Sequence, residues 1–565
     1  MKEQYSTTPH TFNAGPLGFF RGLTVSKSGA GESSQILRYY GGVPYAQPPT
    51  GPLRFRRPQP LPPCYRHGTA TSPGDFTSVP GTKVCPQPAW LGKSPPAKHV
   101  SEDCLQLNIW VPAKARKDEK AWPVLFYIHG GFLQWGDANM SPQGLAPLLD
   151  AESGSAFEAI IVQPAYRLNL FGFLASKELQ NESTEDSVGN LGFWDQRAAL
   201  EWTCRNISLF GGDQDNITVA GYSAGSHSTF QQLAHDLYFV PDNRAIIKRA
   251  IMWSNSPGVQ AKNLEEQQLQ FDELLSALHI PLSLPSSEKL SRLRSIPASK
   301  LVKVQSRLSI SEFRSTTDDA FISASTIAHI NSGDFARRMR RRGIRLFNGE
   351  CAEEHNLYRA WRTPTTDSYA AIYTRLCADY PRAAVDKLLY HYCGNTDPAD
   401  PPAGYKTWID FWGYMYATMQ VHSLERGFHA AITSPADGLR PGKDLFRYRF
   451  EWRAKCVDAF LPPEWGVTHA TDMAIWFWGL DYSKGLEREE KRALKIWNRD
   501  FAAFVRGEEM QGWDTVQGDV KKVRRLKANG ESDIWFDNAW VEGVKVWEVI
   551  NGKVSSITGG ERARL

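Results

Sequence analysis

Short apolar runs alternate with amphipathic segments along the first half of the chain. The runs at 124–129 (VLFYIH) and 159–166 (AIIVQPAY) are rich in β-branched and aromatic residues, which is typical of buried strands. Residues 193–210 place apolar side chains at helical spacing and predict a helix. The segment NITVAGYSAG at 216–225 predicts a short strand, a tight turn and the start of another helix. This alternation predicts an α/β fold, with a mostly parallel central sheet and helices on both faces.

Helical patterns dominate the second half, for example NLEEQQLQFDELLSAL at 263–278. One strand-like run, GIRLFNG at 343–349, interrupts them. The tail begins with a helix, EEKRALKIWNRDFAAFV, and ends in short strand-like pieces that contain Trp540 and Trp547. We interpret residues 1–565 as one domain, with helical cap-like insertions at roughly 260–340 and 360–465 above the sheet.

Composition narrows the class of protein. Hydrophobic residues make up 42% of the 565 positions, enough for a large buried core. The formal net charge of +4 is small and gives no indication of a nucleic-acid partner. No apolar run approaches the roughly 18 residues that span a bilayer, and no apolar segment follows the charged start as in a secretory signal. The eight cysteines form no CxxC pair. We therefore expect a cytoplasmic globular protein without a metal or other cofactor.

The segment Gly221-Tyr222-Ser223-Ala224-Gly225 matches the pattern Gly-x-Ser-x-Gly. On a sharp turn between a strand and a helix, this pattern projects a serine hydroxyl toward a base, and the crowded flanking positions require glycine. The five residues alone are as compatible with an ordinary Gly-Ser turn. Their place between the apolar strand ITVA and a predicted helix favours a nucleophilic Ser223, with the helix amides aimed at the oxygen that becomes negative during attack.

A second glycine pattern, His129-Gly130-Gly131-Phe132, directly follows the strand-like run VLFYI. Consecutive glycines after a strand can direct several amides into one small space, and the alternative is a flexible loop. The order, with this loop before the serine turn, favours an oxyanion hole formed at Gly130, Gly131, Phe132 and Ala224.

Further blocks resemble one family. They are Tyr40-Gly41-Gly42-Val43-Pro44-Tyr45-Ala46, Arg54-Phe55, Ser101-Glu102-Asp103-Cys104-Leu105-Gln106-Leu107-Asn108, Tyr166-Arg167, Gly172-Phe173-Leu174, Asn190-Leu191-Gly192, Asp195-Gln196 and Phe210-Gly211-Gly212-Asp213. With the two glycine patterns, they resemble the type-B carboxylesterase family, the large esterases that include the cholinesterases. The resemblance implies an α/β-hydrolase fold and fades after residue 260, where only islands remain.

The resemblance also indicates the partners of Ser223. The family carries its acid in a short motif after a strand, and Gly349-Glu350-Cys351-Ala352-Glu353-Glu354-His355 occupies that place. Glu354 is the predicted acid, with Glu350 and Glu353 as competitors. The family histidine lies in a Gly-x-x-His segment followed by an acidic residue, and Gly466-Val467-Thr468-His469-Ala470-Thr471-Asp472 matches, so His469 is the predicted base. His227, in the first turn of the predicted helix, is interpreted as a packing or pocket residue.

Two weaker expectations follow from the same resemblance. Ser254 would support the acid by a hydrogen bond. Cys85 and Cys104 match the family's first disulfide pair, although both would be reduced in a cytosolic protein.

Departures from the family pattern bear on the substrate. Phe132 stands where a third glycine is common, and its side chain would narrow the pocket. Tyr222 replaces a glutamate that many relatives have before the serine, which weakens attraction for cationic choline esters. We therefore expect a small-molecule substrate, a neutral, moderately hydrophobic ester or lactone. Alternatives are acyl transfer to another acceptor in natural-product metabolism and a catalytically silent binding protein. The sequence predicts no oligomeric state.

Overall fold

The fold was analysed in a computed structural model of the chain. The structure describes residues 5–28, 35–90, 92–116, 118–183, 188–394, 398–480, 485–513 and 518–554. Its strands are β1 (Tyr5–Asn13), β2 (Phe19–Lys27), β3 (Gln35–Pro44), β4 (Gly74–Asp75), β5 (Gln106–Pro112), β6 (Trp122–Ile128), β7 (Ile160–Pro164), β8 (Gly212–Tyr222), β9 (Arg249–Trp253), β10 (Arg345–Cys351), β11 (Leu445–Phe450), β12 (Lys522–Leu526) and β13 (Ser532–Phe536).

The helices are α1 (Pro142–Leu149), α2 (Asn169–Phe173), α3 (Lys177–Glu182), α4 (Leu191–Asn206), α5 (Ala224–Tyr238), α6 (Leu264–Ala277), α7 (Ser286–Ser295), α8 (Ala298–Gln305), α9 (Thr326–Asn331), α10 (Asp334–Arg341), α11 (Glu354–Ala360), α12 (Tyr369–Asp379), α13 (Arg382–Cys393), α14 (Trp408–Ala417), α15 (Ser423–Thr433), α16 (Met473–Trp476), α17 (Arg488–Arg506) and α18 (Trp540–Asn551).

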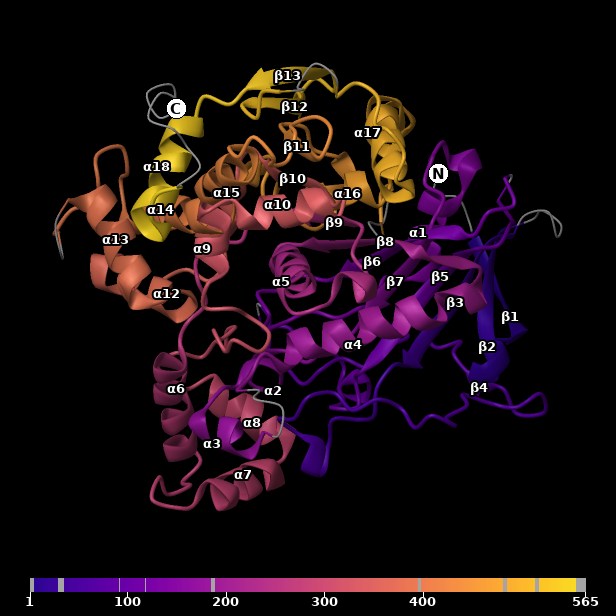
Figure 1. Cartoon of the computed structure of the whole chain (residues 1–565), viewed down its shortest axis with the longest axis horizontal. Helices are drawn as coiled ribbons and strands as arrows, with labels where there is room; N and C mark the ends of the chain where they lie inside the picture. Colours follow the sequence, from indigo (N-terminus) through magenta and orange to yellow (C-terminus); the bar gives the residue numbers. More distant parts are fainter. Residues whose placement is uncertain are drawn as a thin grey trace.

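One sheet runs through the described chain in the order β1-β2-β3-β5-β7-β6-β8-β9-β10-β11-β12-β13, and β4 pairs with β2. From β7 to β12 every neighbouring pair is parallel. Antiparallel pairs close both ends, and Figure 1 shows β1 and β2 far from β12 and β13. The predicted mostly parallel sheet is therefore confirmed.

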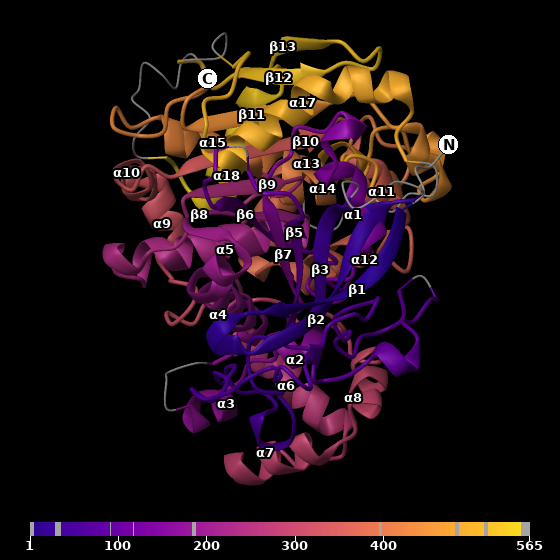
Figure 2. The same ribbon diagram turned by 90° about the vertical axis from the view of Figure 1, so that its right-hand side faces the viewer.

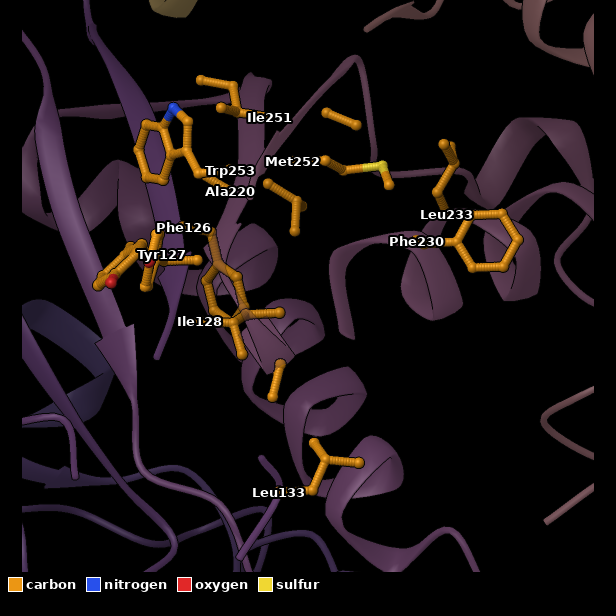
Figure 3. Packing of buried hydrophobic residues seen from close by; sticks show 14 of the residues in the cluster. Phe126, Tyr127, Ile128, Leu133, Ala220, Phe230, Leu233, Ile251, Met252 and Trp253 are labelled. Carbon is orange, nitrogen blue, oxygen red and sulfur yellow. The ribbon is translucent and has the colours of Figure 1, made fainter. Parts of the chain in front are cut away.

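The central strands are buried on both sides because helices cover both faces. In Figure 1, α4 and α5 lie on one side of β6, β7 and β8, and α1 and α17 lie on the other. Figure 3 shows how side chains of β6, β8 and β9 pack beside Phe230 and Leu233 of α5. Two-sided burial explains why β6 and β7 read as continuous apolar runs in the sequence.

Four of the sequence blocks named above are joined in two pairs by arginine–carboxylate contacts. Arg54 donates two hydrogen bonds to Glu102, at 2.6 and 2.5 Å, and Arg167 donates two to Asp195, at 2.8 and 2.7 Å. Bidentate pairs of this kind combine charge with fixed geometry. They tie the loops around the first half of the sheet to its strands and helices.

The later segments depart from the sequence prediction in two places. The predicted insertion at 360–465 contains β11, which pairs in parallel with β10 and belongs to the sheet. The prediction of strand-like pieces around Trp540 and Trp547 is wrong, because these residues lie in α18, which packs against α15. The buried positions of α18 include Trp540, Val544, Trp547 and Ile550, which is helical spacing. The β-branched valines misled the prediction, since tertiary packing overrides intrinsic propensity.

The segments predicted as insertions contain α6 to α10 and α12 to α15. Helix α11 lies between them and follows β10. In Figures 1 and 2 the group α6, α7 and α8 lies apart from the sheet, beside α3.

Candidate active site

Ser223 lies between β8 and α5, on a tight turn with an unfavourable backbone conformation. Its φ is 57°, which is unfavourable for a residue with a side chain. A Cβ atom at Gly221 would collide with Gly225, and one at Gly225 would collide with the carbonyl oxygen of Ile128 at the end of β6. The Ser223 amide donates to the carbonyl oxygen of Trp253 on β9 at 3.0 Å. The spacing of glycines in the sequence thus reflects contacts that leave no room for a side chain, and strained backbones are concentrated at functional sites.

The predicted oxyanion loop reaches the same turn. A Cβ atom at Gly130 would lie 2.6 Å from the carbonyl oxygen of Tyr222 and 3.1 Å from the Cβ of Ser223. Gly131 and Phe132 have φ values of 107° and 57°, so the chain turns sharply here. The backbone N–H groups of Gly131, Phe132 and Ala224 donate to no other group in the described part of the chain. They form a set of unpaired donors on and beside the turn at Ser223.

Glu354 and His469 meet, although they are far apart in sequence. The Nδ1 of His469 lies 2.6 Å from Oε2 of Glu354, and both side chains are buried. The other carboxylate oxygen, Oε1, accepts a hydrogen bond from the Cys351 amide at 3.0 Å. These two contacts fix the carboxylate at the start of α11 and orient the imidazole.

The two competing glutamates have other partners. Glu350 is bound by Arg426 at 3.0 Å, by His422 at 2.6 Å and by Arg449. Glu353 accepts from the Val467 amide at 2.8 Å. Among the three glutamates, only Glu354 has a hydrogen bond to His469 within the described residues.

Ser223 and His469 are not hydrogen-bonded to each other. The ring of Tyr222, the residue before Ser223, packs on the His469 ring with centroids 4.8 Å apart. No hydrogen bond joins Ser223 Oγ to another group within the described ranges, and Nε2 of His469 instead lies 3.4 Å from the Tyr358 hydroxyl. Catalytic hydrogen bonds are often loose in ligand-free sites and shorten when the substrate binds.

Two residues near the histidine were not given a role by the sequence. The Tyr358 hydroxyl lies 3.1 Å from Nδ1 of His469. Tyr358 is one helical turn after Glu354 on α11, so i,i+4 spacing could have found it. Asp472 follows His469 in the motif and is fully buried, and its Oδ2 accepts from Trp476 at 3.0 Å and from Tyr448 at 3.2 Å.

Burial shifts the pKa values of titratable groups around Ser223 and His469. It raises the pKa of Asp472 to about 6, with a further contribution from the negative charge of Glu354. Burial, together with Arg314, lowers the pKa of His227 to about 4. His227 is therefore neutral near pH 7, and it lines the cavity beside Ser223, as the pocket interpretation predicted.

The expected hydrogen bond from Ser254 to the acid is absent. The Ser254 hydroxyl is buried without a hydrogen-bond partner among the described residues. The two oxygens of Glu354 are instead taken by His469 and the Cys351 amide. Cys85 and Cys104 are both buried free thiols, and contact with Cys85, together with burial, raises the pKa of Cys104.

A cavity opens at Ser223. Ser223, Ala224, Phe132 and Leu133 share its wall with His227, and the remaining wall is formed by 255–262, 314–315, 379–380 and 419–420, most of which lie in the predicted insertions. Within the described ranges, no group of three or more His, Cys, Asp and Glu side chains could hold a metal ion. Among the described helices, none is both long and apolar enough to cross a membrane.

Comparison with known proteins shows the family of the chain. The profile of the Carboxylesterase family matches residues 11–537. This chain belongs to the carboxylesterase family. The matched span shows that the likeness extends over nearly the whole chain, well beyond the first 260 residues, and the central sheet is that of the family's α/β-hydrolase fold.

Several relatives resemble this carboxylesterase over most of its length. A carboxylic ester hydrolase of Gibberella moniliformis is 52% identical over 553 residues, 98% of each chain. An uncharacterized esterase/lipase of Schizosaccharomyces pombe is 37% identical over 548 residues, 96% of this chain and 97% of its own. The para-nitrobenzyl esterase of Bacillus subtilis is 29% identical over 479 residues, 82% of this chain and 83% of its own.

Proposed function

We propose that this carboxylesterase hydrolyses esters through Ser223, His469 and Glu354, by way of an acyl-enzyme. The observation that carries the proposal is the buried Glu354–His469 pair, 2.6 Å apart, whose imidazole packs on the residue preceding Ser223. A carboxylate that fixes one ring nitrogen leaves the other for proton transfer. The unpaired amides of Gly131, Phe132 and Ala224 add the donors that acyl transfer requires.

The reaction proceeds in two halves. His469 Nε2 takes the Ser223 proton as Oγ attacks the ester carbonyl, and the oxyanion is held by the three amides. The imidazolium then protonates the departing alcohol, and the C–O bond breaks to leave the acyl-enzyme. Water, deprotonated by His469, attacks the acyl carbon, and the proton returns to Ser223 as the acid leaves. Glu354 orients the imidazole and stabilises its charged form.

The oxyanion donors contribute a large part of the rate. Removing one such donor from a hydrolase typically costs about 3 kcal/mol in the barrier. Gly130 is included in the proposed oxyanion hole because the loop packs against Tyr222 and Ser223 at this residue. Backbone donors cannot be deleted singly, so the side chains of the triad are the test points.

Neutral, moderately hydrophobic esters or lactones are the proposed general substrates. Tyr222 stands beside the histidine at a position where many relatives of the family have a glutamate, so the site has one carboxylate fewer to attract a choline group. Phe132 lines the cavity, and its ring is 7% exposed and packs against Trp90 and Trp135. We therefore propose slow turnover of esters of bulky tertiary alcohols.

We also propose that the chain is one domain in which the segments at 260–340 and 360–465 act as a cap. Residues of both segments line the cavity at Ser223. Divergence in these segments would then change the substrate without changing the triad.

A panel of p-nitrophenyl esters of increasing acyl length tests the activity. We expect Ser223-dependent release of p-nitrophenol, with kcat falling by at least about a thousandfold in Ser223→Ala and His469→Ala. His391→Ala is the matched control, because His391 lies on α13 and pairs with Glu542 at 3.0 Å. Full activity in Ser223→Ala, or equal losses in all three variants, would contradict the assignment.

A further inference from the structure

The cavity at the nucleophile carries more positive than negative charge. Its charged lining residues are Lys262, Arg314 and Asp379, two cations and one carboxylate. His227, also in the wall, is neutral near pH 7 because its pKa is lowered to about 4. Leu133, Val259 and Met419 supply apolar surface between the charges.

Lys262 is a buried cation without a carboxylate partner. Its residue is 6% exposed, and Nζ donates to the carbonyl oxygens of Cys377 at 2.7 Å and Ala378 at 3.0 Å. These carbonyls lie at the C-terminal end of α12, whose dipole favours a cation but does not neutralise it. Lys262 forms no ion pair with any residue that the structure describes. An ammonium has three donors, so one remains for a ligand.

Arg314 is only partly neutralised. Its Nη2 lies 2.5 Å from Oδ1 of Asp379, and its Nη1 donates to the carbonyl oxygen of Phe132. The Nε atom is buried and has no hydrogen-bond partner within the described residues. Because Arg314 binds the oxyanion loop as well as lining the cavity, it connects the two.

Asp379 cannot balance both cations of the wall. It also pairs with Arg362 at 3.0 Å and accepts from the Tyr416 hydroxyl at 2.6 Å. Glu312, which also pairs with Arg362, is shared between Arg362 at 3.2 Å and Arg375 at 2.8 Å. Asp379 and Glu312 each pair with two arginines. Lys262 therefore has no carboxylate as an ion-pair partner among the described residues.

We propose that this cavity binds a carboxylate group of the substrate, so that the preferred ester carries an anionic group remote from the bond that is cleaved. The inference rests on the proposed function, because the cavity is shared with Ser223 and Phe132. In a buried wall the field of an uncompensated cation is screened little by solvent, and a charge-assisted hydrogen bond to a carboxylate is about twice as strong as a neutral one. Neutral esters still reach the nucleophile, but they leave this charge unpaired.

The carboxylate can belong to either side of the ester, and two substrate comparisons separate these cases. For the acyl side, mono-p-nitrophenyl adipate is compared with p-nitrophenyl hexanoate and with the methyl-capped adipate diester. For the alcohol side, 4-acetoxybutyrate is compared with butyl acetate. In one of the two comparisons, we expect kcat/KM for the anionic ester to exceed its neutral counterpart by about tenfold or more, the size of one such hydrogen bond.

A charge variant assigns the preference to the cavity. Lys262→Gln should lower the ratio of anionic to neutral kcat/KM by about tenfold, whereas Lys300→Gln, at an exposed position of α8, removes the same charge elsewhere and should leave the ratio unchanged. The ratio is insensitive to a loss of folded enzyme, and the substrate comparison in the unaltered protein stands without any variant.

The outcomes separate the two claims. If neutral esters are hydrolysed through Ser223 and are preferred in both comparisons, the carboxylate inference is overturned and the proposed function stands. The same holds if an anionic preference is equal in Lys262→Gln and the unaltered enzyme. If neither kind of ester is hydrolysed in a Ser223-dependent way, the proposed function itself fails.

Discussion

Replacing Asp472 by Asn tests whether a second buried carboxylate, close to the Glu354–His469 pair, lowers the stability of the folded protein. Asp472 is fully buried, and Glu354 raises its pKa further by repulsion. Its Oδ2 accepts hydrogen bonds from Trp476 and Tyr448, which an asparagine oxygen can also accept. Its Oδ1 has no hydrogen-bond partner among the described residues.

The magnitude follows from the raised pKa of Asp472. A rise from 3.8 to about 6 corresponds to roughly 3 kcal/mol, at 1.36 kcal/mol for each pKa unit. Because the folded protein holds this proton more tightly than the unfolded chain, Asp472 adds no cost at about pH 4 and below. Stability is lost as the pH rises from about 4 to 6, and the full cost is present above about pH 6. An asparagine does not ionise and avoids this loss.

The assay is urea unfolding of both proteins between pH 4.5 and 8. We expect the free energy of unfolding of Asp472→Asn, relative to the unaltered protein, to rise by up to about 3 kcal/mol across this range. The unpaired amide that replaces Oδ1 costs about 1 kcal/mol at every pH, so the pH-dependent part of the difference carries the test. A difference that stays constant across the range, or that falls with increasing pH, would refute the reasoning.

Three other predictions follow from the geometry of the site. Glu354→Gln should lower kcat in the p-nitrophenyl ester assay by about a thousandfold, because Nδ1 of His469 loses its charged partner. In the same assay the control Glu353→Gln should change kcat by no more than about threefold, because the partner of Glu353 is the Val467 amide. Phe132→Gly should raise the kcat/KM ratio of tert-butyl to ethyl acetate by about tenfold, as measured by acid release, and an unchanged ratio would show that the ring does not limit the pocket. Gly225→Ala should abolish soluble expression or lower Tm sharply, because its Cβ would collide with Ile128, and a normal Tm would contradict the packing of the turn.

The parts of the fold and site that were predictable are those set by local pattern. The strands β6 and β7 were predictable because both of their faces are buried, which gives continuous apolar runs in the sequence. The turn at Ser223 was predictable because Gly221 and Gly225 have no room for a side chain. Helix α18 was missed because its valines favour strands in isolation, and only its packing on α15 makes it helical.

The parts that could not be predicted depend on contacts between distant segments. Lys262, Arg314 and Asp379 stand in three separate stretches of sequence, so the charge of the cavity is invisible until the chain is folded. Similarly, only the folded chain shows that Glu354 pairs with His469, whereas Arg426 and His422, on and before α15, bind Glu350.

Covalent labelling of the nucleophile tests the central claim most directly. The protein is treated with an alkyl p-nitrophenyl phosphonate, its intact mass is measured, and the modified peptide is sequenced by fragmentation. The account predicts one phosphonyl group per chain, on Ser223, with slow labelling in His469→Ala and none in Ser223→Ala. Labelling that persists in Ser223→Ala, or that maps to another serine, would contradict it.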